Sequence, residues 1–573
     1  MMMKKYNSRY RKTSIGCLLL MLLSFSACDY LDFDESNRLY DEESVFTDFG
    51  YTTNILNNLY SYIDQDLGVM GGGAMRACAT DDAEFADPNN AVQDMNNGSW
   101  SALNVKDDVF EKMYKGIRAA NNFLDKFDEN AYLEYKYNTS YPKWEDAFKY
   151  YRYEARALRA YMYFQLVKRY GDVPLITELL TIEEANAMGK TSYDDVVDFI
   201  VSECDAVANE LPVSYLDTRN KQTGRVTKGF VYALRSRVLL YAASPLHNSG
   251  DSKKWEAAAS AALVLIDSTR TKGWYEKELG ANGVNNFRSK EVILFKNNTN
   301  SSSFEKYNFP VRFTAGSTSH TGVCPTQNLV DAFETKNGYR VTLTSNGWQC
   351  DDPEFSSQDP YANRDPRFYQ TILYNGATFK GQTIETFVGG DDYGVVTEGG
   401  TATGYFLKKY IKEEVNFTPG SLVSKPHFWI VFRYGEILLN YAEAMMGAFN
   451  NPDYTSAAYP ISAREALNEV RSAADMPLVD ETNPEEFMTR LRNERRVELA
   501  FEDHRFWDVR RWKLGANTQR EIDGVRIVDN AGVLDYSRVN YESRVWNEKM
   551  NLYPIKEQEL YRNNNLEPQN TGW

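Results

Sequence analysis

Three stretches of the chain each predict a pair of packed helices. The pairs cover residues 153–174 with 193–212, 226–245 with 253–267, and 433–448 with 462–477. In the first helix of each pair, small alanines stand beside bulky aromatic residues, as in "EARALRAYMYF", a pattern typical of closely packed antiparallel helices. Proline follows several of the helix ends, where it stops a helix from continuing. The chain is therefore predicted to be mainly α.

The helix pairs resemble tetratricopeptide units, but they do not keep a constant repeat length. Their first helices begin near residues 154, 227 and 433, so gaps of 73 and 206 residues separate them. Between them, residues 270–430 are rich in Gly, Asn, Ser and Thr and predict loops and brief strands, in "EVILFKNN", "YRVTLTS" and "GYFLKKYI". We expect a helical scaffold with a large loop-rich insertion and minor β structure, in which the loops carry the binding residues.

The N-terminus predicts an export signal. A basic stretch precedes an apolar run, Ile15–Ala27, which is too short to cross a bilayer, since that takes about 20 residues. The small residues Ser26 and Ala27 precede Cys28, and this order resembles the bacterial lipobox, although Phe25 stands where Leu is usual. The resemblance implies lipidation of Cys28; an ordinary export signal with a chance cysteine is the alternative.

These features divide the chain into a signal peptide (1–27), an acidic tether (28–45) and one folded unit (46–573). The folded unit has an N-terminal helical part, about 46–270, and a loop-rich central and C-terminal part, about 271–573. Loss of residues 1–27 removes five basic and no acidic residues, which takes the net charge from −16 to −21. Such a surface repels phosphate backbones, so nucleic acid is excluded as a partner.

The sequence predicts no catalytic metal and no cofactor. The four histidines stand far apart, and "GVMGGG" lacks the Lys-Ser/Thr of a phosphate-binding loop. Asp391 and Asp392 are interpreted as a polar turn, with bound calcium left open because the alternating oxygen ligands of a calcium loop are missing. Cys78, Cys204, Cys324 and Cys350 show no metal-binding spacing, and we expect buried thiols or at most one disulfide.

Six segments resemble, in family order, the SusD/RagB family of outer-membrane nutrient-binding lipoproteins. They are "YRYEARALRAYMYFQLVKRYGDVPL", "NRDPRFYQTILYNG", "RYGEILLNYAEA", "LNEVRSAADMP", "RLRNERRVELAFEDHRFWDVRRWK" and "YPIKEQELYRNNNLEPQNTGW". One departure is Asp503, where the family commonly has Gly; we expect a left-handed backbone there, which Asp tolerates better than most residues.

The resemblance implies a single SusD-like fold, anchored at the cell surface beside a SusC-like TonB-dependent outer-membrane transporter. It implies capture of a nutrient, most often an oligosaccharide or polysaccharide, for uptake. The acidic residues after Cys28 resemble a surface-export signal, which places the protein on the outer membrane facing the exterior. Peptide capture, as in RagB-like members, is the alternative within the family.

The charged segment 490–513 could be mistaken for a catalytic site. Glu494 and Glu498 share a helix face, but Arg495 and Arg496 beside them would keep both carboxylates ionised, whereas a general acid needs a raised pKa. We therefore predict a structural ion-pair lattice between packed helices, with Trp507 and Trp512 in the core. No segment of the sequence indicates the pair of carboxylates that a glycoside hydrolase needs, so the protein is predicted not to be an enzyme.

Sugar recognition needs flat aromatic faces with polar side chains at the rim. Three tryptophans stand in polar, loop-like surroundings: Trp100 in "NNGSWSALN", Trp274 in "TKGWYEK" and Trp348 in "SNGWQCDD". They are the predicted glycan platforms, although any one of them could instead be a core residue. Asp81, Asp82 and Asn104 are the predicted polar partners.

Overall fold

The computed structural model describes residues 42–64, 67–278, 286–318, 321–394 and 400–573. The predicted signal peptide, Cys28 and most of the tether lie outside these residues. The helices are α2 (Glu42–Thr47), α3 (Phe49–Leu59), α4 (Gln93–Asn96), α5 (Phe110–Lys126), α6 (Tyr141–Phe148), α7 (Tyr151–Tyr170), α8 (Ile182–Ala187), α9 (Tyr193–Ala208), α10 (Lys228–Ala243), α11 (Ser252–Lys272), α13 (Ser303–Asn308), α14 (Gln327–Val330), α15 (Phe368–Thr371), α16 (Tyr434–Phe449), α17 (Ala463–Ala473), α18 (Pro484–Glu498), α19 (Arg505–Arg511), α20 (Gly515–Thr518) and α21 (Glu557–Arg562).

The strands pair two by two, always antiparallel, and all except β13 and β14 are short. They are β1 (Val69–Gly71), β2 (Ala74–Met75), β3 (Ala83–Phe85), β4 (Val292–Asn297), β5 (Val323–Pro325), β6 (Thr342–Thr344), β7 (Gly347–Gln349), β8 (Ile372–Leu373), β9 (Thr378–Phe379), β10 (Gln382–Thr383), β11 (Phe406–Leu407), β12 (Phe428–Arg433), β13 (Glu521–Asn530) and β14 (Val533–Ser543). The pairs are β1–β2, β3–β5, β4–β12, β6–β7, β8–β11, β9–β10 and β13–β14.

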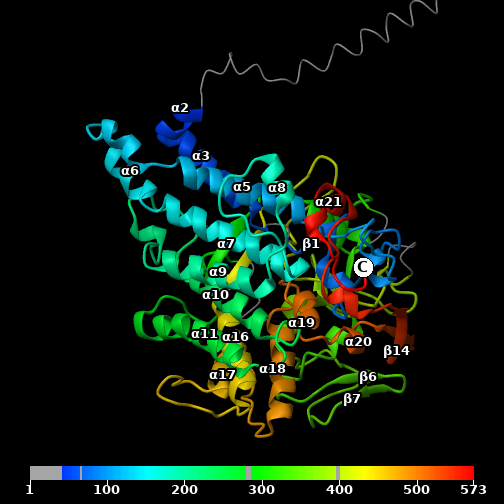
Figure 1. Ribbon diagram of the computed structural model, residues 1–573. Helices are drawn as coiled ribbons and strands as arrows, with labels where there is room; N and C mark the ends of the chain where they lie inside the picture. Colours follow the sequence, from blue (N-terminus) through cyan, green and yellow to red (C-terminus); the bar gives the residue numbers. More distant parts are fainter. Residues whose placement is uncertain (1–41, 65–66, 279–285, 319–320, 395–399) are drawn as a thin grey trace, which may run out of the picture.

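The three predicted helix pairs are confirmed. Helix α7 packs on α9, α10 on α11, and α16 on α17. Further contacts of α9 with α10 and of α11 with α16 stack the three pairs into one layered array (Figure 1). The helices approach one another closely, which explains the small residues at their contacts. A Cβ added to Gly447 on α16, for example, would lie 2.3 Å from the ring of Trp255 on α11.

The predicted strands also form, and one longer hairpin was not predicted. The segments "EVILFKNN", "YRVTLTS" and "GYFLKKYI" contain β4, β6 and β11. The hairpin β13–β14 is the addition; it turns at Ala531 and Gly532, whose φ angles of 56° and 91° are left-handed. Helices and short strand pairs together give the expected mainly α fold with minor β structure.

The predicted ion-pair lattice forms and joins four distant parts of the chain. Its pairing differs from the prediction, because Arg495 and Arg496 pair with Asp508 and Asp82 instead of with Glu494 and Glu498. Arg433, at the end of β12, bonds Glu498 at 2.7 Å and Glu502 at 2.6 Å, and its third carboxylate partner is Glu291. Arg367 bonds Glu498 at 2.8 Å and also pairs with Glu494 of the same helix, α18. Burial alone would raise the pKa of Glu502, but the adjacent Arg433 and Lys409 outweigh it and lower that pKa.

The predictions for Asp503 and the core tryptophans are likewise confirmed. Asp503 has φ 64°, and its carboxylate accepts hydrogen bonds from the Trp507 indole at 3.0 Å and from Arg76 at 3.3 Å. Glycine could not make these two bonds, which gives a reason for Asp at this position. Trp507 and Trp512 are both buried.

The four cysteines of the folded unit are free thiols. Cys78, Cys204 and Cys324 are buried and Cys350 is half-buried. Burial raises the pKa of Cys324 to about 12, so its thiol stays protonated and unreactive at neutral pH.

Glu443 on α16 gives a test of the lattice. Its carboxylate accepts from Arg511 at 2.7 Å and from the Trp512 indole at 2.6 Å. Burial would raise its pKa, but Arg511 outweighs burial and lowers the value from 4.5 to about 2. A carboxyl with a lower pKa in the folded state stabilises the protein above its unfolded pKa, so this contribution, roughly 3 kcal/mol, is lost as the pH falls from about 5 toward 2.

We therefore expect Glu443→Gln to lower the free energy of unfolding by about 3–5 kcal/mol at pH 7, because Arg511 loses a buried partner. The loss should shrink between pH 5 and pH 3, as measured by urea unfolding. The control is Glu469→Gln, which breaks a more exposed pair with Arg270 at 2.7 Å and should cost no more than about 1 kcal/mol. Equal costs in the two variants would contradict the prediction.

Candidate functional site

An aromatic pocket with a volume of about 230 Å³ lies where Trp274 leaves α11. Three segments line it: the turn 213–216, the loop 222–227, and residues of the stretch from Trp274 to Phe295. Helix α11 ends at Lys272 and is capped by Gly273, whose φ of 67° is left-handed. The chain can therefore turn away from the helix axis at once, which puts Trp274 in the pocket wall instead of on the helix.

The neighbouring helix α10 fixes the two aromatic residues that follow this turn. The ring of Trp274 stacks on Tyr232, with the centroids 6.3 Å apart and the planes inclined by 6°. Tyr275 lies against Gly229, where an added Cβ would come within 1.9 Å of the tyrosine hydroxyl. Only glycine at position 229 leaves room for this ring. Burial raises the pKa of Tyr275 to about 12, so its hydroxyl stays neutral at physiological pH.

A buried ion pair holds the inner wall of the pocket. Arg225 donates to Glu154 at 2.6 and 2.9 Å, and Tyr215 donates to the second oxygen of the same carboxylate at 2.8 Å. Burial is the largest influence on the pKa of Tyr215 and, with Glu154, raises it well above the usual value. Tyr215 and Arg225 therefore keep fixed positions before any ligand arrives.

Phenylalanine rings close the other side, and polar groups form the rim. Phe287 packs against Phe295 of β4, with ring centroids 4.9 Å apart. At the rim, Lys290 pairs with Glu276 at 2.8 Å, and Gln222 is exposed. An aromatic floor with amide, hydroxyl and ammonium groups around it suits the apolar faces and hydroxyl groups of a pyranose ring.

The structure does not bring the other predicted platforms into this pocket. Trp100 is 1% exposed, and its ring packs edge-on against Tyr553 and Trp573 with centroids 4.9 and 4.8 Å away. Burial therefore removes Trp100 from the candidate platforms and places it in the core. Trp348, on β7, is half-buried among Phe355, Tyr361 and Tyr536; it stays a candidate.

The three predicted polar partners also lie elsewhere. Asp81 and Asp82 are buried, at 5% and 0% exposed, in ion pairs with Arg496 and Arg505. Burial would raise the pKa of Asp81, but the two guanidinium groups lower it to about 2. Both carboxylates thus belong to the scaffold and not to a ligand rim. Asn104 is exposed and bonds Asp94 at 3.0 Å and Lys106 at 2.8 Å.

Sequence reasoning therefore found one of the pocket's rings and missed the others, which are Tyr215, Tyr275, Phe287 and Phe295. Tyr275 could have been found, because it follows Trp274 directly. The rest come from separate segments, and only the pairing of β4 with β12 and the Arg225–Glu154 bond bring them together.

Among the described residues, no group of three or more His, Cys, Asp or Glu side chains could hold a metal ion. Asp392 is one of the two carboxylates considered above as calcium ligands. Its oxygens accept hydrogen bonds from the Arg312 guanidinium at 2.8 Å and from the backbone amide of Glu385 at 2.9 Å. The helices of the described segments include none that is both long and apolar enough to cross a bilayer.

Two family descriptions match most of the chain. Residues 290–573 match the SusD family, and residues 29–240 match a family described as starch-binding, associating with the outer membrane. The chain belongs to the SusD/RagB family. The second description associates the family with starch binding and with the outer membrane.

Relatives and solved structures agree with this assignment. The SusD-like protein P38 of Formosa agariphila is 25% identical over 443 residues, which cover 73% of this chain and 74% of the relative. A SusD-like protein from Bacteroides fragilis is 27% identical with a TM-score of 0.73, covering 93% of this chain and 99% of its own. A SusD-like carbohydrate-binding protein from the same species is 25% identical with a TM-score of 0.69, covering 91% and 100%. The fold is thus SusD-like.

The Trp274 pocket gives the next prediction. We expect Trp274→Ala to weaken the binding of a glycan about 5- to 30-fold and to lower the melting temperature much less than loss of a core tryptophan would, because the half-buried ring packs mainly on Tyr232 and offers its area to the ligand. Titration calorimetry measures the affinity.

Trp100→Ala is the matched control. We expect it to lower the free energy of unfolding by about 3–5 kcal/mol, since it opens a cavity beside Trp573, and to leave affinity unchanged in the fraction that stays folded. An unchanged affinity in Trp274→Ala would contradict the assignment of this pocket.

Proposed function

We propose that this SusD/RagB family member captures an oligosaccharide or polysaccharide in the Trp274 pocket and delivers it to a SusC-like TonB-dependent transporter. The observation that carries the proposal is the pocket itself, in which five aromatic rings surround a space of about 230 Å³. Aromatic contacts with a few polar groups are what sugar recognition uses. The B. fragilis protein described as carbohydrate-binding has the same fold and supports the same ligand class.

The pocket is built for binding and not for hydrolysis. Glycoside hydrolysis needs two carboxylates about 5–9.5 Å apart on either side of the scissile bond. Among the described residues, the lining of the pocket includes no Asp or Glu; its charged side chains are Arg225 and Lys290. Glu276 at the rim is paired with Lys290, so a bound sugar would not meet the two flanking carboxylates that hydrolysis needs. We propose that the protein has no catalytic activity and needs no cofactor.

Attachment to the outer membrane is proposed to run through Cys28. The apolar run before this cysteine and the acidic residues after it support a lipid anchor with the folded unit on the outer face of the cell. Several acyl chains hold a protein firmly where one does not. Intact-mass measurement of the native protein tests the anchor: an unmodified Cys28 in the mature chain would refute it.

A second candidate function, peptide capture, has an observation of its own. A larger and more apolar pocket of about 710 Å³ lies between α5, α8 and α21. Phe110, Tyr114, Ile176 and Leu566 are among its lining residues, and Ile182 at its edge is 81% exposed. Such a groove suits the apolar side chains of a peptide better than the hydroxyl groups of a sugar.

Native affinity electrophoresis separates the two candidates. Gels that contain laminarin, amylopectin or xylan should retard the wild-type protein in at least one case, and a tryptic digest of casein should leave its melting temperature unchanged. Retardation should occur without release of reducing sugar. A shift of the melting temperature by the digest, with no retardation by any of the polysaccharides, would favour peptide capture and contradict the glycan proposal.

A further inference from the structure

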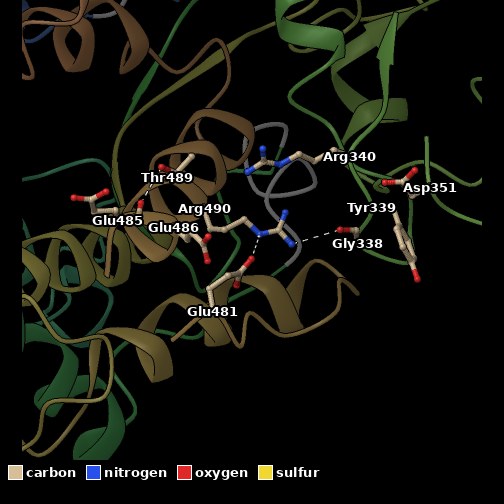
Figure 2. A pocket seen from close by; sticks show the side chains of 9 residues that line it. All are labelled: Gly338, Tyr339, Arg340, Asp351, Glu481, Glu485, Glu486, Thr489 and Arg490. Atoms are coloured by element: carbon tan, nitrogen blue, oxygen red, sulfur yellow. Dashed lines mark hydrogen bonds and ion pairs between the residues drawn. The ribbon is translucent and has the colours of Figure 1, made fainter. Parts of the chain in front are cut away.

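A third cavity, polar and about 650 Å³ in volume, lies between α18 and the β6–β7 hairpin (Figure 2). One wall consists of the segment 338–340 and Asp351, which flank the hairpin. The other consists of Glu481 and the first turns of α18, with Glu485, Glu486 and Thr489. The cavity shares none of its lining residues with the Trp274 pocket.

Arg490 ties the two walls together. Its guanidinium pairs with Glu481 at 2.7 Å and with the buried Glu334, and it lies 3.4 Å from the carbonyl oxygen of Gly338 (Figure 2). Glu334 is held in turn by Arg471 at 3.0 Å. Because these contacts link the helix to the loop that precedes β6, the cavity exists before a ligand arrives, which lowers the entropic cost of binding.

Several side chains around the cavity are left for a ligand. Arg340 is exposed, and its guanidinium extends from the hairpin wall toward α18 (Figure 2). Glu485, Glu486 and Asp351 are exposed as well, and within the described part of the chain none of these four groups makes an ion pair. Tyr339, on the same wall as Arg340, is 42% exposed.

The combination of these groups identifies the ligand class. Among its described residues, the cavity has three unpaired carboxylates and one unpaired guanidinium, so its net negative charge repels a polyanion. Its lining is mostly polar, so an apolar ligand would find little apolar surface to contact there. A neutral polyol satisfies both kinds of group at once, because its hydroxyls donate to carboxylates and accept from a planar guanidinium. Tyr339 adds a ring that a pyranose can contact.

We infer that this cavity is a second binding site for a neutral glycan, with Arg340 as its principal hydrogen-bond donor. This inference rests on the proposed function. In Figure 1, β6, β7 and α18 lie at the end of the molecule opposite α2. A chain bound at two sites gains avidity without further contacts.

Variants of the full chain test the inference, with laminarin and amylopectin as neutral probes and dextran sulfate as the polyanion. Arg340→Ala should weaken binding of the neutral polysaccharide about 10-fold, since a hydrogen bond to a charged group is lost. Arg340→Lys should also weaken it, because lysine keeps the charge but not the planar fork. Trp274→Ala should retain weak binding that the double variant with Arg340→Ala loses.

Arg526→Ala, at another exposed arginine outside the cavity, is the matched control and should bind as the wild type does. Wild-type affinity in both Arg340 variants, with Trp274→Ala defective, would overturn the second site alone. Tight binding of dextran sulfate through Arg340 would overturn the neutral ligand class. If neither laminarin nor amylopectin binds the wild type, the inference fails together with the proposed function for these glycans.

Discussion

The buried pairing of Arg433 with three carboxylates is the interaction on which the rest of the structure depends. Glu291 directly precedes β4, Glu498 ends α18, and Glu502 lies in the turn that follows α18. All four side chains are at most 5% exposed. A buried charge is tolerated only when its partners are in place, so this cluster forms only when the insertion, the third helix pair and the C-terminal helices have docked together.

The candidate binding site depends on the same arrangement. The lattice holds β12 against α18, β12 pairs with β4, and β4 carries Phe295 into the wall of the Trp274 pocket. A second ion pair, Arg225 with Glu154, fixes the opposite wall. Two buried sets of ion pairs, the Arg433 cluster and the Arg225–Glu154 pair, thus hold opposite walls of the pocket. They keep the aromatic rings in place at the protein surface.

Local patterns of the sequence predicted much of the scaffold but little of the site. The helix pairs follow from alanine and aromatic spacing within about 20 residues. The dense charges of 490–513 indicated a structural ion-pair lattice, but not its distant partners Arg367 and Arg433. The burial of Trp100 could not be predicted in this way, because it depends on Trp573 at the other end of the chain. Asp81 and Asp82 looked like loop carboxylates for the same reason: their partners, Arg496 and Arg505, are distant in sequence.

The central claim is that a sugar binds on the aromatic floor beside Trp274. A crystal structure of the protein soaked with an oligosaccharide of the polysaccharide that retards it in native gels tests this claim most directly. The account predicts a pyranose ring against Trp274, with its hydroxyls toward Gln222 and Lys290. A fully occupied sugar at Trp348 or in the groove between α5 and α8, with the Trp274 pocket empty, would contradict it.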